Sequence, residues 1–324
     1  MNATMAQAIN QAIALEMKRD ERVVILGEDV GKDGGVFRVT DGLVDAFGPE
    51  RVIDTPLAES AAVGVAVGMT VLGLRPVVEI QFMGFIYPAF NQIVAHVARL
   101  RNRTRGRFPV PIVIRTPYGA GVRALEHHSE STEALFCHIP GLTVAVPSTP
   151  YDAKGLLAAA VRSDDPVILL EPTRLYRSGR QEIPEEAYEV PLGKARIVRE
   201  GTDLTIIAWG AMVPVAEKAA DLAFAEGWTP EVIDLLTLSP MDRATIVGSV
   251  KKTGRALVVH EAPKTCGLGA EIAAHIGEAA LLSLKAPILR VTGWDITPPL
   301  PKSEDHYYPN PERVLRAVRK LMEF

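Results

Sequence analysis

The residue in this sequence best placed to do chemistry is Glu59, a carboxylate at the start of a long apolar segment. Before it, Arg51–Asp54 predicts a short strand, and Thr55-Pro56 predicts a helix start with an N-cap hydroxyl followed by proline. After Glu59 no charged residue occurs until Arg75. A carboxylate at the edge of a dry core can hold a raised pKa and pass protons. The structural alternative is that Glu59 only offsets the helix dipole.

A group of aromatic residues follows the next apolar run of strand type. Gln81, Phe82, Phe85 and Tyr87 lie in the segment EIQFMGFIYPAF, directly after a predicted strand. Ligands of open parallel sheets bind beyond the carboxyl ends of the strands. These aromatic rings could therefore enclose a flat heterocycle, although aromatic residues also fill ordinary cores.

Two adjacent histidines, His127 and His128, lie in the acidic stretch ALEHHSESTEA. An imidazole titrates near neutral pH, so either one suits proton transfer. Adjacent side chains of one loop point apart, and the spacing of the acids and histidines matches no zinc motif. The stretch therefore predicts an acid–base residue and no metal site.

Two further patterns have weaker chemical meaning. Gly119–Ala124 fits the G-x-G-x-x-A fingerprint of dinucleotide-binding proteins, but no amphipathic helix opens on its glycines. It leaves a nicotinamide-dependent oxidoreductase as an alternative. Arginine alternates with other residues from Arg99 to Arg107, so an extended chain would carry all five arginines on one face. Such a stripe favours a partner subunit or an anionic cofactor.

Composition sets the limits of the function. The chain has 324 residues, 48% hydrophobic and 23% charged, which is enough for two domains with cores of their own. A net charge of -4 gives no case for nucleic acid as the main partner. Two cysteines exclude a disulfide framework and indicate a reducing compartment. No membrane partner is expected, because the longest uncharged apolar run, Ser60–Leu74, is too short for a bilayer.

The first residues, MNATMAQAIN, resemble neither a signal peptide nor a transit peptide. We therefore expect a cytoplasmic location, or the mitochondrial matrix if a transit peptide has been removed. Met5, Ile9, Ile13 and Met17 are spaced four residues apart, which predicts a first helix with one apolar face.

Strand-type and helical patterns alternate along the chain, as in parallel sheets covered by helices. The predicted strands are Val23–Leu26, Pro76–Ile80, Val110–Arg115, Leu142–Val146, Val167–Leu170, Leu204–Ala208, Glu231–Ile233 and Ala256–His260. The predicted helices are Glu59–Leu72, Tyr87–Leu100, Pro150–Ser163, Val213–Glu226 and Gly269–Glu278. The polar stretch Arg174–Pro191 reads as a linker. The fold class is therefore α/β, with two domains at 1–185 and 186–324, each a mostly parallel sheet with helices on both faces.

The helix predicted at Glu59–Leu72 has a stripe of small residues. Ser60, Gly64 and Gly68 share one face, so another helix can approach closely, in the core or at a subunit contact. The apolar composition predicts that this helix is buried on nearly every side.

Six segments together resemble the beta subunit of the thiamine-diphosphate-dependent decarboxylase of 2-oxo acid dehydrogenase complexes. In chain order they are ILGEDVG (25–31), RVIDTPLAE (51–59), EIQFMGFIYPAF (79–90), HSES (128–131), GLTVAVPSTPYDAKGLL (141–157) and VVHEAP (258–263). The resemblance covers nearly the whole chain. It implies a transketolase-like pyrimidine-binding domain at 1–185, followed by a transketolase C-terminal-like domain at 186–324.

The resemblance also implies roles for individual residues. Glu59 would contact the aminopyrimidine ring of thiamine diphosphate, and His128 would face the acyl group and serve its transfer to the lipoyl disulfide. His127 departs from the family pattern, so the choice between the two imidazoles stays open. The residues implied to bind the cofactor are Glu28, Leu57, Ala58, Glu59, Gln81 and Phe85. Those implied to bind substrate are Phe82, Met83, Gly84, Phe85 and His128.

One family feature is absent from the sequence. The superfamily holds the cofactor's diphosphate through Mg²⁺ with a G-D-G motif, and this chain contains no GDG. The resemblance therefore implies an alpha subunit that carries most of the Mg²⁺ site, in an assembly of two alpha and two beta chains. It also implies an acyltransferase core with lipoyl and subunit-binding domains as a partner.

The substrate is the least determined part of the prediction. Tyr87–Phe90 and the following NQIV favour a branched-chain 2-oxo acid of the 2-oxoisovalerate type. RTRGRF and PSTPYDAKGLL are similar to segments of bacterial pyruvate enzymes, so pyruvate is the alternative. A non-catalytic scaffold that only recruits partners is a further alternative.

Overall fold

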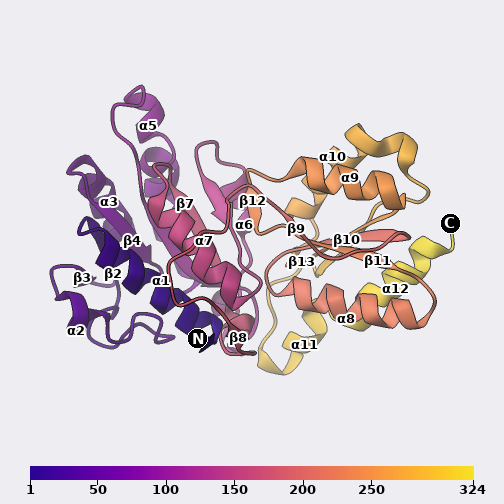
Figure 1. Ribbon diagram of the computed structural model, residues 1–324, viewed down its shortest axis with the longest axis horizontal. Helices are drawn as coiled ribbons and strands as arrows, with labels where there is room; N and C mark the ends of the chain where they lie inside the picture. The colour runs from indigo at the N-terminus through magenta and orange to yellow at the C-terminus, as the bar shows by residue number, and fades with distance from the viewer.

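A computed structural model describes all 324 residues as two sheets lying side by side, each flanked by helices (Figure 1). The first sheet has seven strands in the order β12-β6-β7-β5-β4-β2-β3, and the second has five in the order β14-β13-β10-β11-β9. In each sheet only one edge strand, β12 or β9, pairs antiparallel. The predicted fold class is therefore confirmed. The boundary placed between residues 185 and 186 stays a prediction.

The first sheet takes almost all of its strands from the first half of the chain. These are β2 (Val23–Gly27), β3 (Val52–Asp54), β4 (Arg75–Glu79), β5 (Val113–Tyr118), β6 (Thr143–Ala145) and β7 (Val167–Pro172). The surrounding helices are α1 (Met5–Arg19), α2 (Leu43–Phe47), α3 (Glu59–Val71), α6 (Glu133–Cys137) and α7 (Pro150–Arg162). The remaining strand, β12 (Thr237–Ser239), returns from the second half and pairs with β6.

The second sheet consists of β9 (Arg196–Arg199), β10 (Leu204–Ala208), β11 (Pro230–Asp234), β13 (Ala256–Pro263) and β14 (Leu289–Gly293). Its helices are α8 (Met212–Ala225), α9 (Arg243–Thr253), α10 (Leu268–Ala280), α11 (Glu304–Tyr307) and α12 (Pro311–Met322). The short strands β1 (Asn2–Ala3) and β8 (Gln181–Glu182) pair with each other. This pairing ties the segment predicted as a linker to the first residues of the chain.

The predicted single helix at Tyr87–Leu100 is wrong. The chain there forms a 3₁₀ turn (Met83–Ala89), α4 (Phe90–Gln92), a π-turn (Ile93–Val97) and α5 (Leu100–Arg103). Pro88 lies inside the first of these turns and has no N–H to donate, so a regular helix cannot run through it.

Helix α1 begins as its sequence pattern predicts. Thr4 caps it through a reciprocal capping box with Gln7, and Met5, Ile9, Ile13 and Met17 are all fully buried. No helix of the structure has both the length and the apolar composition that crossing a membrane would require.

Helix α3 differs from its prediction at its start and on its surface. It begins at Glu59, and Thr55 does not cap it, because the Thr55 amide still bonds to Gly27 in continuation of the β2–β3 pairing. The prediction of burial on nearly every side is also wrong. Only Ala62, Val63, Ala66 and Thr70 are buried, whereas the exposed apolar residues include Val65 (54% exposed), Val71 (45%) and Leu72 (83%). In this chain α3 therefore has one uncovered apolar face.

Candidate active site

Four neighbouring strands bring the predicted site residues to one edge of the first sheet. Strands β3, β2, β4 and β5 are adjacent and parallel, so their carboxyl ends lie together. Glu28 directly follows β2, Glu59 opens the helix after β3, and Gln81 lies two residues beyond β4. His127 and His128 lie in the loop after β5. This edge is where ligands of open parallel sheets bind.

The carboxyl group of Glu28 lies within electrostatic range of the Glu59 carboxylate. Partial burial raises the pKa of Glu28, and the negative charges of Glu59 and Asp29 raise it further. Gln81 donates a long hydrogen bond of 3.5 Å from its Nε2 to the Glu28 carbonyl oxygen. The raised pKa of Glu28 makes this carboxyl group suited to hold a proton at the edge of the site.

On the other side of the site, His128 is enclosed by aromatic rings. Its ring centroid lies 4.6 Å from that of Phe82 and 5.2 Å from that of Phe85, both in edge-on contacts. His128 Nδ1 is buried and has no hydrogen-bond partner in this chain. A buried polar atom of this kind requires a partner, and a bound ligand can provide one.

His127 has different surroundings. Its side chain is 47% exposed, and its Nδ1 lies 4.0 Å from a carboxylate oxygen of Glu130. Its ring approaches Phe85 at 5.6 Å and Tyr87 at 5.7 Å between centroids. The two imidazoles thus point to different environments, and His128 is the more enclosed.

The loop that carries the aromatic residues depends on a glycine. A Cβ atom at Gly84 would lie 2.2 Å from the His127 carbonyl oxygen, so only glycine lets the two loops approach. Met83 is 1% exposed and belongs to the hydrophobic core, so its side chain supports the loop from within. By contrast, Leu57 is 81% exposed and lies just before Ala58 and Glu59 on the open side of the site. The predicted substrate and cofactor contacts of these residues stay predictions.

Comparisons with known proteins decide the family. The transketolase pyrimidine-binding domain matches residues 1–179, and the transketolase C-terminal domain matches residues 193–314. The chain is 55% identical over 318 residues to the pyruvate dehydrogenase E1 component subunit beta of Acholeplasma laidlawii, covering 98% of this chain and 97% of the relative. It is 52% identical to the same subunit of Bacillus subtilis, with 99% of both chains covered. The chain belongs to the E1 beta subunits of thiamine-diphosphate-dependent 2-oxo acid dehydrogenases.

Solved structures agree with this beta-subunit fold. A split-gene transketolase described as an inactive beta4 tetramer superimposes with a TM-score of 0.81 at 25% identity, covering 100% of this chain and 99% of that one. A transketolase from Pichia stipitis matches with a TM-score of 0.71 at 13% identity, and the match covers 46% of that longer chain.

The side chains at the carboxyl edge fit half of a thiamine diphosphate site. The carboxyl groups of Glu28 and Glu59 at this edge suit a ring nitrogen that exchanges a proton, and the unpartnered His128 Nδ1 suits a polar group beside the reacting carbon. No group of three or more His, Cys, Asp or Glu side chains in the beta subunit could hold a metal ion. The donor set here therefore fits the ring end of the cofactor rather than its metal-bound diphosphate.

A buried ion cluster links three strands of the first sheet, and the sequence patterns did not reveal it. The fully buried guanidinium of Arg115 on β5 pairs with Glu79 on β4 and with Glu171 on β7. Tyr176 donates its hydroxyl to Glu171. The cluster joins the carboxyl ends of three strands. Its only signal in the sequence is a charged residue near the end of each of three apolar runs.

The second domain of the beta subunit holds the loop between β5 and α6 through the ion pair of Arg123 with Asp305 and through three further hydrogen bonds. Tyr308 Oη donates to the carbonyl oxygen of Ser129 at 2.9 Å, directly after His128. The amide of Gly121 donates to Glu304 at 3.1 Å, and that of Ala120 donates to Glu261 at 3.3 Å. Sequence patterns missed these contacts, because more than 140 residues separate the partners in each pair.

The dinucleotide interpretation of Gly119–Ala124 is wrong for this beta subunit. Gly119 and Gly121 adopt positive φ angles, and a Cβ atom at either position would collide with Glu261 or with Arg174. The glycines therefore permit close packing of the loop. The loop continues into a three-residue 3₁₀ turn at Glu126–His128 and not into the helix that a dinucleotide fingerprint requires.

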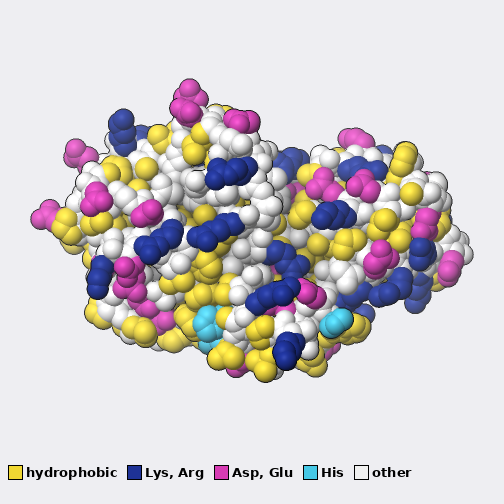
Figure 2. All heavy atoms as spheres, turned by 90° about the horizontal axis from the view of Figure 1, so that it is seen from below, with side chains coloured by type: hydrophobic (Ala, Val, Ile, Leu, Met, Phe, Trp, Pro, Cys, Tyr) yellow, Lys and Arg dark blue, Asp and Glu magenta, His cyan; other side chains and the backbone are white.

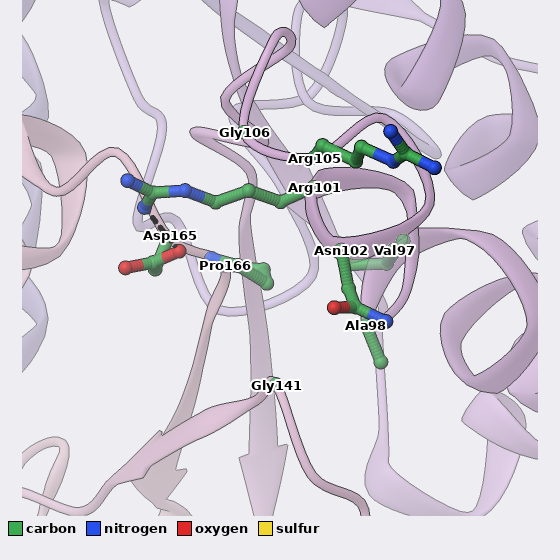
Figure 3. A pocket seen from close by; sticks show the side chains of 9 residues that line it. All are labelled: Val97, Ala98, Arg101, Asn102, Arg105, Gly106, Gly141, Asp165 and Pro166. Atoms are coloured by element: carbon green, nitrogen blue, oxygen red, sulfur yellow. Dashed lines mark hydrogen bonds and ion pairs between the residues drawn. The ribbon is translucent and has the colours of Figure 1, made fainter.

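The arginines from Arg99 to Arg107 do not form an extended stripe. Helix α5 and the turn after it distribute them, and Arg103 bonds back to the carbonyl oxygen of Ala95. Figure 3 shows Arg101 reaching toward Asp165, with which it pairs, while Arg105 points away from it. Of the five arginines, Arg101 and Arg105 line a pocket of about 350 Å³ just before β6 and β7. This is the amino end of the sheet, so the pocket is separate from the candidate active site.

The buried acids at the domain junction predict a pH-dependent stability. Burial raises the pKa values of Glu133 and Glu261 to about 7, and each carboxyl group is fully enclosed. Since the folded protein then binds more protons than the unfolded chain between pH 4.5 and about 7, stability falls as the pH rises through that range. Glu133→Gln should remove part of this fall and stabilise the protein at pH 8 by on the order of 1–3 kcal/mol.

Thermal denaturation between pH 5 and pH 8 measures this effect. Glu126→Gln, which changes an exposed acid in the loop before α6, is the control and should leave the pH dependence of the stability unchanged. Parallel curves for the Glu133→Gln variant and the unmodified protein would contradict the assignment.

Proposed function

We propose that the chain is the beta subunit of a pyruvate dehydrogenase E1 component. With an alpha subunit it would decarboxylate pyruvate on thiamine diphosphate and transfer the acetyl group to lipoyl groups of an acyltransferase core. The observation that carries the substrate assignment is the near-complete coverage of beta subunits with that name at about half identity, 55% and 52%. The relatives thus favour pyruvate as the substrate, whereas the sequence segment Tyr87–Phe90 favoured a branched-chain 2-oxo acid. A branched-chain 2-oxo acid stays the second candidate.

In this proposal the residues at the carboxyl edge of the first sheet have different roles. Glu59, assisted by Glu28, exchanges a proton with the aminopyrimidine ring, while Leu57, Ala58, Gln81 and Phe85 line the ring. His128 faces the acyl group and delivers a proton during its transfer, within a wall made by Phe82, Met83, Gly84 and Phe85. Thiamine diphosphate, held by these residues, would supply a nucleophilic carbon for the 2-oxo carbonyl and a thiazolium ring as the electron sink for decarboxylation.

The proposal requires an alpha subunit, in an assembly of two alpha and two beta chains. Two observations support it: the sequence lacks the GDG motif for Mg²⁺ and diphosphate, and α3 has an uncovered apolar face beside Glu59. The alpha subunit would carry most of the Mg²⁺ site. The lipoyl and subunit-binding domains of the acyltransferase core would be the further partners, with no role for nucleic acid or membrane.

Reconstitution tests this function. The purified chain alone should not turn over pyruvate, whereas the chain with an alpha subunit, thiamine diphosphate and Mg²⁺ should acetylate an isolated lipoyl domain, seen as a mass increase. Turnover by the chain alone, or a reconstituted pair that leaves the lipoyl domain unmodified, would contradict the proposal.

The exposed face of α3 predicts how the assembly can be disrupted. Gly68 is exposed, and a Cβ atom there would meet nothing within 4 Å in this chain. Gly68→Leu should therefore leave the chain folded but block a closely packed partner, so the tetramer should dissociate in size-exclusion chromatography with light scattering. Gly64 is less suitable, since its Cβ would already contact Gln92 at 3.5 Å.

Gly248→Leu is the matched control, because Gly248 is an exposed helical glycine on α9 with similar free space around it. A Gly68→Leu variant that still elutes as the tetramer would show that α3 is not a closely packed contact.

A further inference from the structure

The second domain contains a pocket whose lining is strongly basic. It has a volume of about 440 Å³ and lies at the carboxyl ends of β13 and β14, beside helix α12. Four cationic side chains line it: Lys264, Arg290, Arg313 and Arg316. In Figure 2, basic side chains gather along the lower edge of this half of the molecule. Such a concentration is unusual in a chain whose net charge is -4.

The positive charges in this pocket outnumber the single acid of its lining, Asp295. None of the four forms an ion pair; Arg290 donates to the carbonyl oxygen of Lys264, and Arg313 donates to those of Thr292 and Tyr307. The one acid in the lining, Asp295, is occupied by the amide and hydroxyl of Thr265. By comparison, Arg319 lies on α12, as Arg313 and Arg316 do, but outside the pocket, and it pairs with Glu226.

The surroundings of Arg313 disfavour its positive charge. Burial lowers the pKa of its guanidinium, and the nearby positive charge of Arg316 lowers it further. Its position is nevertheless fixed, because it stacks over the Trp294 ring at 4.5 Å and the Trp294 Nε1–H donates to the carbonyl oxygen of His306. Arg290 and Arg313 are partly buried, whereas Lys264 and Arg316 are exposed at the rim of the pocket. Cations gathered around one pocket are stabilised by an anion that they share.

We propose that this basic pocket binds a small molecule through a phosphate or diphosphate group. Arginine forks and a lysine ammonium converging from three segments match phosphate oxygens, and the carboxyl edge of an open parallel sheet is the usual ligand position. The volume accommodates a phosphate ester rather than a polymer. The site lies in the second domain, on residues that the acyl-transfer chemistry does not use, so it does not depend on the proposed function.

Binding of pyrophosphate tests this site. The full chain in complex with its alpha subunit is first saturated with thiamine diphosphate and Mg²⁺, so that the active site does not compete for the probe. Titration calorimetry at low ionic strength should then show one pyrophosphate bound per beta chain. A double variant, Lys264→Gln with Arg316→Gln, should weaken binding about 10-fold or more, because two charge-assisted contacts are lost. Both side chains are exposed and bond to no other residue, so the fold should survive.

The matched control is Lys320→Gln with Arg319→Gln, which also removes two positive charges, both from α12 outside the pocket, and should change the affinity less than twofold. Equal weakening in both double variants would mean attraction by net charge alone and would overturn the proposal. No binding to the saturated complex would overturn it as well, since a partner subunit would then cover the pocket. Because binding is measured without turnover, failure here is distinct from failure of the proposed function.

Discussion

Glu59→Gln will slow exchange of the thiazolium carbon proton for deuterium by about 100- to 10,000-fold in the reconstituted enzyme. The amide keeps the shape of the side chain at the first turn of α3 but can no longer give or accept the proton that the aminopyrimidine ring requires. The assembly should be unaffected, because the apolar face of α3 is unchanged. Quenched-flow exchange followed by proton NMR of the released cofactor measures this step directly.

Glu21→Gln provides the control, since Glu21 is an exposed acid remote from the carboxyl edge and should leave exchange at the unmodified rate. Unchanged exchange in Glu59→Gln would mean that another residue activates the cofactor. Loss of exchange with the tetramer intact would exclude a chain that only recruits partners.

His128→Ala will impair reductive acetylation of a lipoyl domain by about 100-fold or more, while reduction of an artificial electron acceptor falls much less. Transfer to the lipoyl disulfide requires a proton at the departing sulfur, and the artificial acceptor bypasses that step. The enclosure of His128 by Phe82 and Phe85, with its Nδ1 buried and free, makes it the suited imidazole. Parallel assays of the two reactions on the same preparation give the ratio.

His127→Ala is the comparison variant, because His127 is half-exposed and faces Glu130. It should change neither reaction strongly. Equal losses in both assays for His128→Ala would assign that residue to substrate binding or decarboxylation. A large selective loss for His127→Ala would show that the neighbouring imidazole transfers the proton.

Local sequence patterns were sufficient for the elements whose signal lies within one segment. The strand at Leu204–Ala208 and the first helix with its Thr4 cap follow from apolar periodicity and capping chemistry. The same periodicity located the carboxyl ends where Glu28, Gln81 and His128 lie. Parallel pairing then brings these residues together without further information.

Contacts made after folding could not be predicted in the same way. Thr55-Pro56 has the local signature of a helix start, but the pairing of Thr55 with Gly27 keeps it extended. The apolar helix α3 reads as core, although in this chain Val65 and Leu72 are uncovered. The hydrogen bond from Tyr308 to Ser129 joins residues 179 positions apart. A single sequence contains no periodic signal for such a contact.

The most direct test of the proposed pyruvate decarboxylation is to compare two substrates with the same reconstituted enzyme. The chain is purified with its alpha subunit, loaded with thiamine diphosphate and Mg²⁺, and assayed for kcat/KM with pyruvate and with 2-oxoisovalerate. We expect kcat/KM for pyruvate to be at least about 10-fold higher than that for 2-oxoisovalerate, a preference of about 1.4 kcal/mol in the transition state. A preference for 2-oxoisovalerate, or no decarboxylation of either 2-oxo acid, would contradict it.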